Sequence, residues 1–228
     1  MRRYLLLILT ICSVLAAMTF GIIKRQTYTD MTKEEYYLAQ LQVGELPENI
    51  AEVQCDRMRQ SLPEAPLIIR VEVTGEIEHS FKVDRQKAVV REIYAGSGLE
   101  KNEEIYIFSD HWKLSLDGNP NSTERGSIER GFVNIMDVGT EYLIFAKAVV
   151  ENPTADIPLV KVYDDFTIAP VFCCEERQNT AIPTGEENTY VPYRDVMDNE
   201  FFGTSERALQ LMEELKAQML QLYLKQDT

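Results

Sequence analysis

The sequence predicts an α+β, mainly β fold: a small five-stranded barrel flanked by helices, preceded by an N-terminal transmembrane helix. Apolar and polar residues alternate with a period of two through most of the middle of the chain, which is the pattern of half-buried strands. Five such stretches lie between helical patterns, which favours a closed or partly closed barrel over a parallel βαβ sheet. The first 25 residues contain a long apolar run.

The apolar run extends from Tyr4 to Ile23 and is 20 residues long. At about 1.5 Å rise per residue it would cross a hydrocarbon core about 30 Å thick. Arg2 and Arg3 precede it, and positive residues favour the cytoplasmic side, so the rest of the chain would be extracytoplasmic. The alternative is a secretory signal cleaved near residues 14–16, after which the chain would be secreted. We favour a signal-anchor over residues 1–25, because the run continues past that site.

Residues 26–65 predict a helical lead-in. A short helix is expected over 29–41, and a second one follows Pro47 and covers 48–62. The apolar positions expected on one side of the second helix are Ile50, Val53 and Met58.

The barrel is predicted over residues 66–172. Its strands are expected at 67–80, 87–95, 103–109, 137–150 and 158–172, with a turn at Gly139 leading into the fourth and a kink at Asp164–Asp165 in the last. The polar stretch 110–130 is expected to be a long loop with one edge strand. Gly75 falls in the apolar register of the first strand and indicates a bend or a close approach by another backbone.

Alternation also predicts which side chains face inward. In the second strand the inward pair is Val89 and Ile93, and in the third it is Ile105 and Ile107. The inward face expected for the fourth strand consists of Tyr142, Ile144, Ala146, Ala148 and Val150.

The end of the chain predicts an irregular acidic linker over 173–203 and an amphipathic helix over 204–226. Thr204 or Ser205 would cap this helix, and apolar residues recur at steps of three and four: Leu209, Met212, Leu215, Met219 and Leu222. The apolar face would pack on the barrel or, alternatively, pair with another protein. The paired acidic residues Glu175–Glu176 and Glu186–Glu187 are expected to be solvated, with an acidic docking surface as the alternative.

The charge distribution argues against nucleic-acid binding. Four of the 23 basic residues and none of the 37 acidic ones lie in the first 25 residues, so the remaining chain carries a formal charge of −18. Such a body repels phosphate backbones. The sequence indicates no cofactor.

Export of the body would place its cysteines in an oxidising compartment. Outside the apolar run the chain contains Cys55, Cys173 and Cys174, an odd number that permits one internal disulfide. Cys55 would pair with Cys173 or Cys174; the alternative is three buried thiols. A zinc site is not expected, because there is no Cys-x-x-Cys and neither histidine has ligand spacing to a cysteine.

Candidate contact residues gather in the loop after the third strand. Trp112 is the only tryptophan, and it would be an exposed contact anchor or would be buried over the barrel mouth. His111, Lys113 and Arg125 belong to the same loop. Ser109, Asp110 and His111 are adjacent in sequence, whereas a catalytic triad needs residues that converge from separate positions, so an enzyme is not predicted. A weak calcium site at 117–121 is disfavoured, because the EF-hand glycine and glutamate are missing.

Four segments together resemble a known family: Val71-Glu72-Val73-Thr74-Gly75-Glu76-Ile77, then 88–96, then 104–107, and Gly139-Thr140-Glu141-Tyr142-Leu143-Ile144-Phe145. Their order resembles the netrin-module or tissue-inhibitor-of-metalloproteinase-like OB-fold, and also uncharacterised exported proteins of Gram-positive bacteria. The resemblance covers about residues 66–171 and implies the fold. The inhibitors of this family use an N-terminal Cys-x-Cys that chelates zinc, which this sequence lacks, so that mechanism does not carry over.

The sequence therefore predicts a membrane-anchored, extracytoplasmic binding module without catalytic activity. Its partner would be a protein at the cell surface, bound through His111, Trp112, Lys113 and Arg125, because OB-folds bind with strand faces and rim loops. The alternative is an inhibitor or regulator of an extracellular hydrolase that does not use the Cys-x-Cys mechanism.

Overall fold

The computed structural model describes residues 13–15, 17–20, 38–39, 41–80, 83–115, 126–150, 156–182 and 190–224. Contacts divide the chain into two compact units, Met1–Glu34 and Glu35–Thr228. In the first unit, residues 13–15 and 17–20 are helical. No helix in the described ranges has both the length and the apolar character needed to cross a bilayer. Most of the predicted span, and most of the predicted helix at 29–41, lie outside these ranges.

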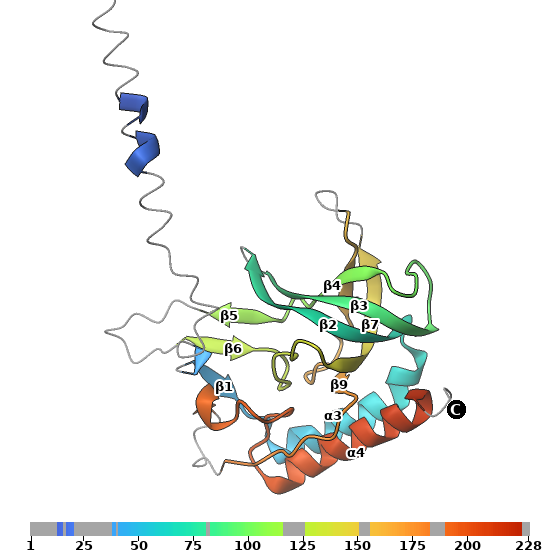
Figure 1. Ribbon diagram of the computed structural model, residues 1–228. Helices are drawn as coiled ribbons and strands as arrows, with labels where there is room; N and C mark the ends of the chain where they lie inside the picture. Colours follow the sequence, from blue (N-terminus) through green and yellow to red (C-terminus); the bar gives the residue numbers. More distant parts are fainter. Residues whose placement is uncertain are drawn as a thin grey trace, which may run out of the picture. The chain divides into compact units, whose positions relative to one another are not determined.

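The second unit is an α+β structure built on a five-stranded mixed barrel (Figure 1). The strand order is β2-β3-β4-β8-β7, and β7 closes the barrel by pairing with β2. Only the β4–β8 pair is parallel within this barrel. The arrangement is compatible with an OB-fold, as expected. The barrel strands are β2 (Leu67–Ser80), β3 (Val83–Ala95), β4 (Glu104–Phe108), β7 (Glu141–Val150) and β8 (Leu159–Val162).

Strand β2 follows its sequence pattern closely. Ile69, Val71 and Val73 are fully buried. The β2–β3 register shifts between Val73 and Ile77, and a Cβ on Gly75 would lie 2.9 Å from the Lys87 Cβ. The close approach predicted from Gly75 is therefore confirmed.

Strand β3 departs from its prediction at Val89 but not at Ile93, which pairs with the fully buried Ile69 and packs against the core beyond a register shift. Val71 pairs with Val90 and Val73 pairs with Ala88, so Ala88 and Val90 are fully buried while Val89 is only partly covered. The run 88–90 is apolar on both faces, so alternation alone does not fix its phase. The pairing with β2 fixes it, because opposite residues of two paired strands share a face.

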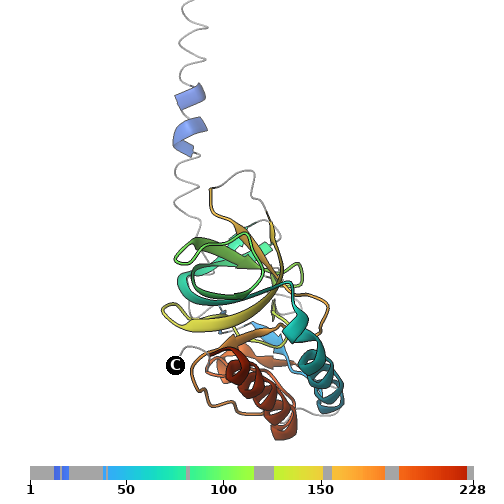
Figure 2. The same ribbon diagram turned by 90° about the vertical axis from the view of Figure 1, so that its right-hand side faces the viewer.

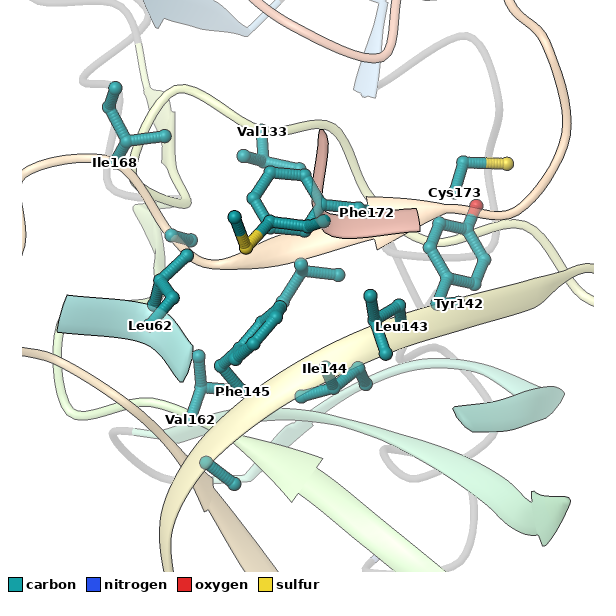
Figure 3. Close-up of a cluster of buried hydrophobic side chains, with 14 of the residues drawn as sticks. Leu62, Val133, Tyr142, Leu143, Ile144, Phe145, Val162, Ile168, Phe172 and Cys173 are labelled. Carbon is teal, nitrogen blue, oxygen red and sulfur yellow. The ribbon is translucent and has the colours of Figure 1, made fainter. Parts of the chain in front are cut away.

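Strand β7 is buried on both faces along its first half. Tyr142, Ile144 and Ala146 are buried as predicted, but Leu143 and Phe145 are fully buried as well. Phe145 lies against Phe172, with ring centroids 6.0 Å apart (Figure 3). The predicted inward positions Ala148 and Val150 are exposed, and the β7–β8 register shifts between Ala146 and Ala148.

The last predicted strand is two strands. β8 ends at Val162. β9 (Val171–Cys173) pairs with the first half of β7, whereas β8 pairs with its second half. The predicted kink at Asp164–Asp165 lies in the irregular segment between them. Lys147 and Lys161 both bind the carboxylate of Asp164, which lowers the pKa of that group against the effect of its burial.

Helices α3 (Glu48–Ser61) and α4 (Glu206–Tyr223) lie side by side below the barrel (Figures 1 and 2). In α3 the buried residues are Ala51, Cys55 and Met58, while Ile50 and Val53 are 38% and 64% exposed. The predicted face of α3 was wrong except at Met58. The true stripe uses a small residue and a cysteine at helical spacing, where a pattern of large side chains does not reveal it.

Helix α4 follows its prediction. The Ser205 hydroxyl accepts a hydrogen bond from the Ala208 amide and caps the helix. Its buried stripe is Leu209, Met212, Leu215 and Met219; Leu222, predicted with them, is 43% exposed. The ring of Tyr223 lies 5.7 Å from that of Phe145, so the helix packs on the barrel.

A second, four-stranded sheet was not predicted. Its strands are β1 (Gln42–Gly44), β5 (Lys113–Ser115), β6 (Ser127–Glu129) and β10 (Tyr190–Pro192), in the order β10-β1-β6-β5. The stretch 110–130 thus contributes two strands where one edge strand was expected. The sheet has its own small core, made of Leu41, Val43, Leu114, Ile128, Val191, Tyr193, Val196 and Phe202.

The described residues after β9, 174–182 and 190–203, are largely irregular apart from β10 and one short 3₁₀ turn, but some of them are deeply buried. The carboxylate of Glu200 accepts hydrogen bonds from the Cys173 amide and from the Lys216 ammonium, at 2.7 and 2.5 Å. Glu200 is 3% exposed. The segment is therefore tied both to β9 and to α4.

Candidate functional site

Two cavities meet at the turn that links the barrel to the second sheet, residues Ser109 to Lys113. The barrel-side cavity has a volume of about 360 Å³ and lies between this turn and the segment 162–169. The sheet-side cavity has a volume of about 370 Å³ and is lined by all four strands of the second sheet. His111 and Gly131 border both cavities. Both volumes fall in the range of small-molecule sites.

The residues predicted for contacts take different positions around these cavities. His111 and Lys113 are exposed, and Lys113 lines the sheet-side cavity. Trp112 is 2% exposed, so of the two expectations for it the buried one is correct. Trp112 therefore is not an exposed contact anchor. Arg125 lies outside the described residues, as does the stretch 117–121, where a calcium site was disfavoured.

The face of Trp112 is covered by Arg130. The sequence pattern did not identify Arg130 as a candidate site residue. Its guanidinium carbon lies 3.8 Å from the centroid of the Trp112 ring, in cation–π geometry. One guanidinium nitrogen donates to the Gln86 side chain at 3.2 Å. The other two have no hydrogen-bond partner among the described residues. Arg130 is 3% exposed, and burial lowers its pKa to about 10, an effect that nearby Asp84 opposes. It remains charged at neutral pH.

Gln86 anchors this arrangement from the barrel wall. It lies on β3 and is fully buried. Its amide donates to the Met136 carbonyl at 2.8 Å and accepts from the Met136 amide at 3.1 Å. Asp84 also lies on β3, is 1% exposed and is 2.6 Å from the His79 ring. The inward face of β3 thus carries two polar residues, which an apolar alternation pattern does not identify.

Glu45 also lines the sheet-side cavity and directly follows β1 in the chain. It is 1% exposed, and neither carboxylate oxygen has a hydrogen-bond partner of normal geometry among the described residues. Burial raises its pKa to about 7, and the backbone amide of Ile182 offsets the rise only in part. A buried carboxyl group with this pKa changes charge near neutrality.

The backbone between Arg130 and Phe132 holds the cavity wall in an unusual conformation. Gly131 and Phe132 have φ angles of 65° and 61°, in the left-handed region that is costly for phenylalanine. A Cβ on Gly131 would lie 2.8 Å from the Ala169 backbone nitrogen, so only glycine fits. The Phe132 carbonyl accepts from the Phe202 amide at 3.0 Å. This turn places Arg130 and Phe132 in the wall of the same cavity.

The Ser109-Asp110-His111 segment forms a turn. The His111 backbone amide donates to the Ser109 hydroxyl at 3.2 Å, and the Asp110 carboxylate lies 2.6 Å from the Lys161 ammonium. Asp110 is therefore paired with a lysine of β8.

The three cysteines of the body are free thiols. Cys55 and Cys173 are buried, and burial raises the pKa of Cys55 to about 11. Cys174 is partly covered, and burial raises its pKa to about 12. Within the described ranges, no three His, Cys, Asp or Glu side chains gather into a metal-binding group.

Fold and site together define a small β-barrel protein with a charged cavity between its barrel and an added sheet. Comparison of the chain with protein-family models and with curated proteins finds no match.

Proposed function

We propose that this chain is a binding module, held outside the cytoplasm by its N-terminal apolar segment, and that it captures a protein partner at the face around Ser109–Lys113. The observation that carries the proposal is the meeting of two cavities at this turn, with the exposed side chain of His111 between them. Concave surfaces beside barrel rims are common binding sites.

The membrane anchor is supported by the composition and exposure of the N-terminal segment. Large apolar side chains of the described helical residues are strongly exposed: Val14, Leu15, Met18 and Phe20 are 49%, 57%, 62% and 63% exposed. Exposed apolar surface of this kind is typical of contact with a membrane or a partner. The excess of basic residues in the first 25 positions, against an acidic remainder, supports export of the body.

The resemblance to netrin-module and metalloproteinase-inhibitor barrels, and to exported proteins of Gram-positive bacteria, agrees with a binding role. Proteins with this architecture share a fold rather than an activity, so the analogy supports the class of function alone. A non-catalytic role is also supported by the pairing of Asp110 with Lys161, because among the described residues no carboxylate is bonded to the adjacent His111 as a triad requires.

The test is chemical cross-linking on intact cells that carry the full-length chain, followed by mass spectrometry of the captured proteins. We expect the double variant His111→Ala, Lys113→Ala to lose most of the specific capture. Lys101→Ala is the matched control, because Lys101 is exposed and lies on another loop. Capture that is equal in the double variant and in the control would contradict the proposal. Inhibition of an extracellular hydrolase by the purified chain would instead favour the alternative function, that of an inhibitor or regulator of such an enzyme.

A further inference from the structure

Unpaired buried charges are concentrated at the sheet-side cavity. Both carboxylate oxygens of Glu45 and two guanidinium nitrogens of Arg130 have no hydrogen-bond partner of normal geometry among the described residues; the Ile182 backbone amide offsets only part of the effect of burial on Glu45. Both residues line this one cavity, although they come from distant parts of the chain. Each is at least 97% buried. Isolated buried charges are costly, and where they persist they are commonly part of a functional site.

The two side chains carry opposite charges but do not pair with each other. No ion pair between them lies within 4.0 Å, and each has its pKa shifted mainly by burial rather than by the other. The cavity therefore presents an anionic group and a cationic group as separate recognition elements. A simple anion would meet Glu45, and a simple cation would meet Arg130, so neither complements the whole cavity.

The rest of the lining adds a basic rim and aromatic walls. His111 and Lys113 flank Trp112 in the sequence, are exposed and line the cavity. Glu129 of β6 is also exposed and lines the cavity. Phe132, Phe202 and Tyr190 supply aromatic surface. A ligand that fits would carry a carboxylate, an ammonium group and an apolar part. A volume of about 370 Å³ suits a molecule of that size.

We propose that the sheet-side cavity binds a small zwitterionic amino-carboxylate, of the amino acid or dipeptide class, with its carboxylate toward Arg130 and its ammonium group toward Glu45. The inference deepens the proposed binding function and rests on it, because the cavity borders the same turn. A guanidinium–carboxylate contact and an ammonium–carboxylate contact are both charge-assisted, and such hydrogen bonds are about twice as strong as neutral ones.

The proposal predicts a pH dependence. Ammonium recognition needs Glu45 as the carboxylate, and its pKa is about 7. The affinity should therefore be about tenfold weaker at pH 6 than at pH 8. The other titratable groups around the cavity are His111, Lys113, Glu129, Arg130 and Tyr190. Histidine titrates in the same range, so the series is repeated in His111→Ala.

The experiment is isothermal titration calorimetry on the purified full-length chain in mild detergent. The probes are L-leucine, L-phenylalanine and L-alanyl-L-phenylalanine, each with its N-acetyl derivative and its C-terminal amide. We expect at least one zwitterion to bind, and both derivatives of that probe to bind about tenfold to a hundredfold more weakly, since each loses one charged contact.

Glu45→Gln should weaken zwitterion binding by a similar factor and remove the difference between pH 6 and pH 8, whereas Lys101→Ala should change neither. Glu45→Gln removes an unpaired buried charge, so loss of folding would not explain its loss of binding; circular dichroism checks this. Arg130→Gln tests the carboxylate end in the same way.

Two results would overturn the inference: no binding of any probe at millimolar concentration, or binding that N-acetylation and Glu45→Gln leave unchanged. If the probes fail while capture on cells still depends on His111 and Lys113, the inference fails and the proposed protein-binding function stands. If a zwitterion binds as predicted and no protein is captured, the cavity ligand stands and the protein partner does not.

Discussion

The barrel and the second sheet differ in how their strands are drawn from the chain. The barrel uses strands of up to 14 residues, and β2, β3 and β4 follow one another in sequence. The second sheet uses four strands of three residues each, taken from positions as far apart as 42 and 192. Its core in the described residues has eight buried apolar side chains, against 39 in the main cluster.

The two regions also differ in how they treat charge. Within the barrel, Gln86 is held by hydrogen bonds to the Met136 backbone, and Asp84 has one carboxylate oxygen paired with His79 and one without a partner among the described residues. Beside the second sheet, Glu45 and Arg130 keep charged atoms without partners among the described residues. The candidate site therefore lies beside the sheet with the smaller core, where two charged side chains meet at one cavity.

The largest expected effect on stability comes from removing a large buried side chain from the barrel core. Phe145→Ala should cost about 3–5 kcal/mol of unfolding free energy, because the ring is fully buried between Phe172 and Tyr223. Phe202→Ala is the matched change in the second sheet, where the ring already borders a cavity. This change should cost only about 1–3 kcal/mol, which is mainly the free energy of transferring the apolar ring from water into the core. Denaturant unfolding measures both, and equal costs would mean that the two cores are equally tight.

An intermediate effect is expected at two glycines of the segment that links β6 to β7. Gly139→Ala introduces a side chain at φ 85° in open space and should cost about 1–2 kcal/mol. Gly131→Ala adds to a similar strain a clash with the Ala169 backbone, and should cost about 1–3 kcal/mol more. The difference between the two variants in chemical denaturation reports how rigidly the cavity wall is held. A cost for Gly131→Ala no larger than that of Gly139→Ala would indicate a soft wall.

The smallest effect on stability is expected at the exposed rim. His111→Ala and Lys113→Ala should each change the unfolding free energy by less than about 0.5 kcal/mol, because both side chains are exposed and make no structural contact described above. Thermal unfolding checks this. A loss of several kcal/mol would assign these residues to the packing of the turn and would remove the basis for using them as probes of binding.

The sequence predicted the barrel because its strands are long enough for a period of two to be recognised. The phase was harder: Val89 and Val90 are both apolar, and only the pairing with β2 decides that Val90 faces inward. The helix face of α3 failed for a related reason, since Ala51 and Cys55 are weak signals beside Ile50 and Val53.

The second sheet and the charged cavity could not be predicted in this way. A three-residue strand shows no period, and β1 and β6 are parallel neighbours more than 80 residues apart in sequence. The sequence placed His111, Trp112 and Lys113 in one loop, whereas Lys113 begins strand β5; their role in binding stays a prediction. It gave no sign that Glu45 lies near them, or that Arg130 stacks on Trp112, because both depend on tertiary contacts. The nearest local signal is Gly131, which follows Arg130 at a positive φ.

The central claim is that the cavity beside the second sheet holds a buried charge that destabilises the protein. The pKa of Glu45 is raised to about 7 in the folded state. The folded state thus holds this proton more tightly than the unfolded state, where the pKa of a glutamate is about 4.3. At low pH Glu45 is neutral in both states and does not reduce the free energy of unfolding. This free energy falls as the pH rises above the unfolded pKa, and the loss is complete once the pH has passed through about 7.

The most direct measurement is therefore the unfolding free energy of the full-length protein and of Glu45→Gln at pH 5 and at pH 8. The variant does not titrate at this position, so the difference between the two proteins isolates Glu45. We predict that Glu45→Gln gains about 2–3 kcal/mol relative to the natural chain between pH 5 and pH 8. A difference that stays constant with pH would contradict the account, because Glu45 would then not be a buried carboxyl group without a partner.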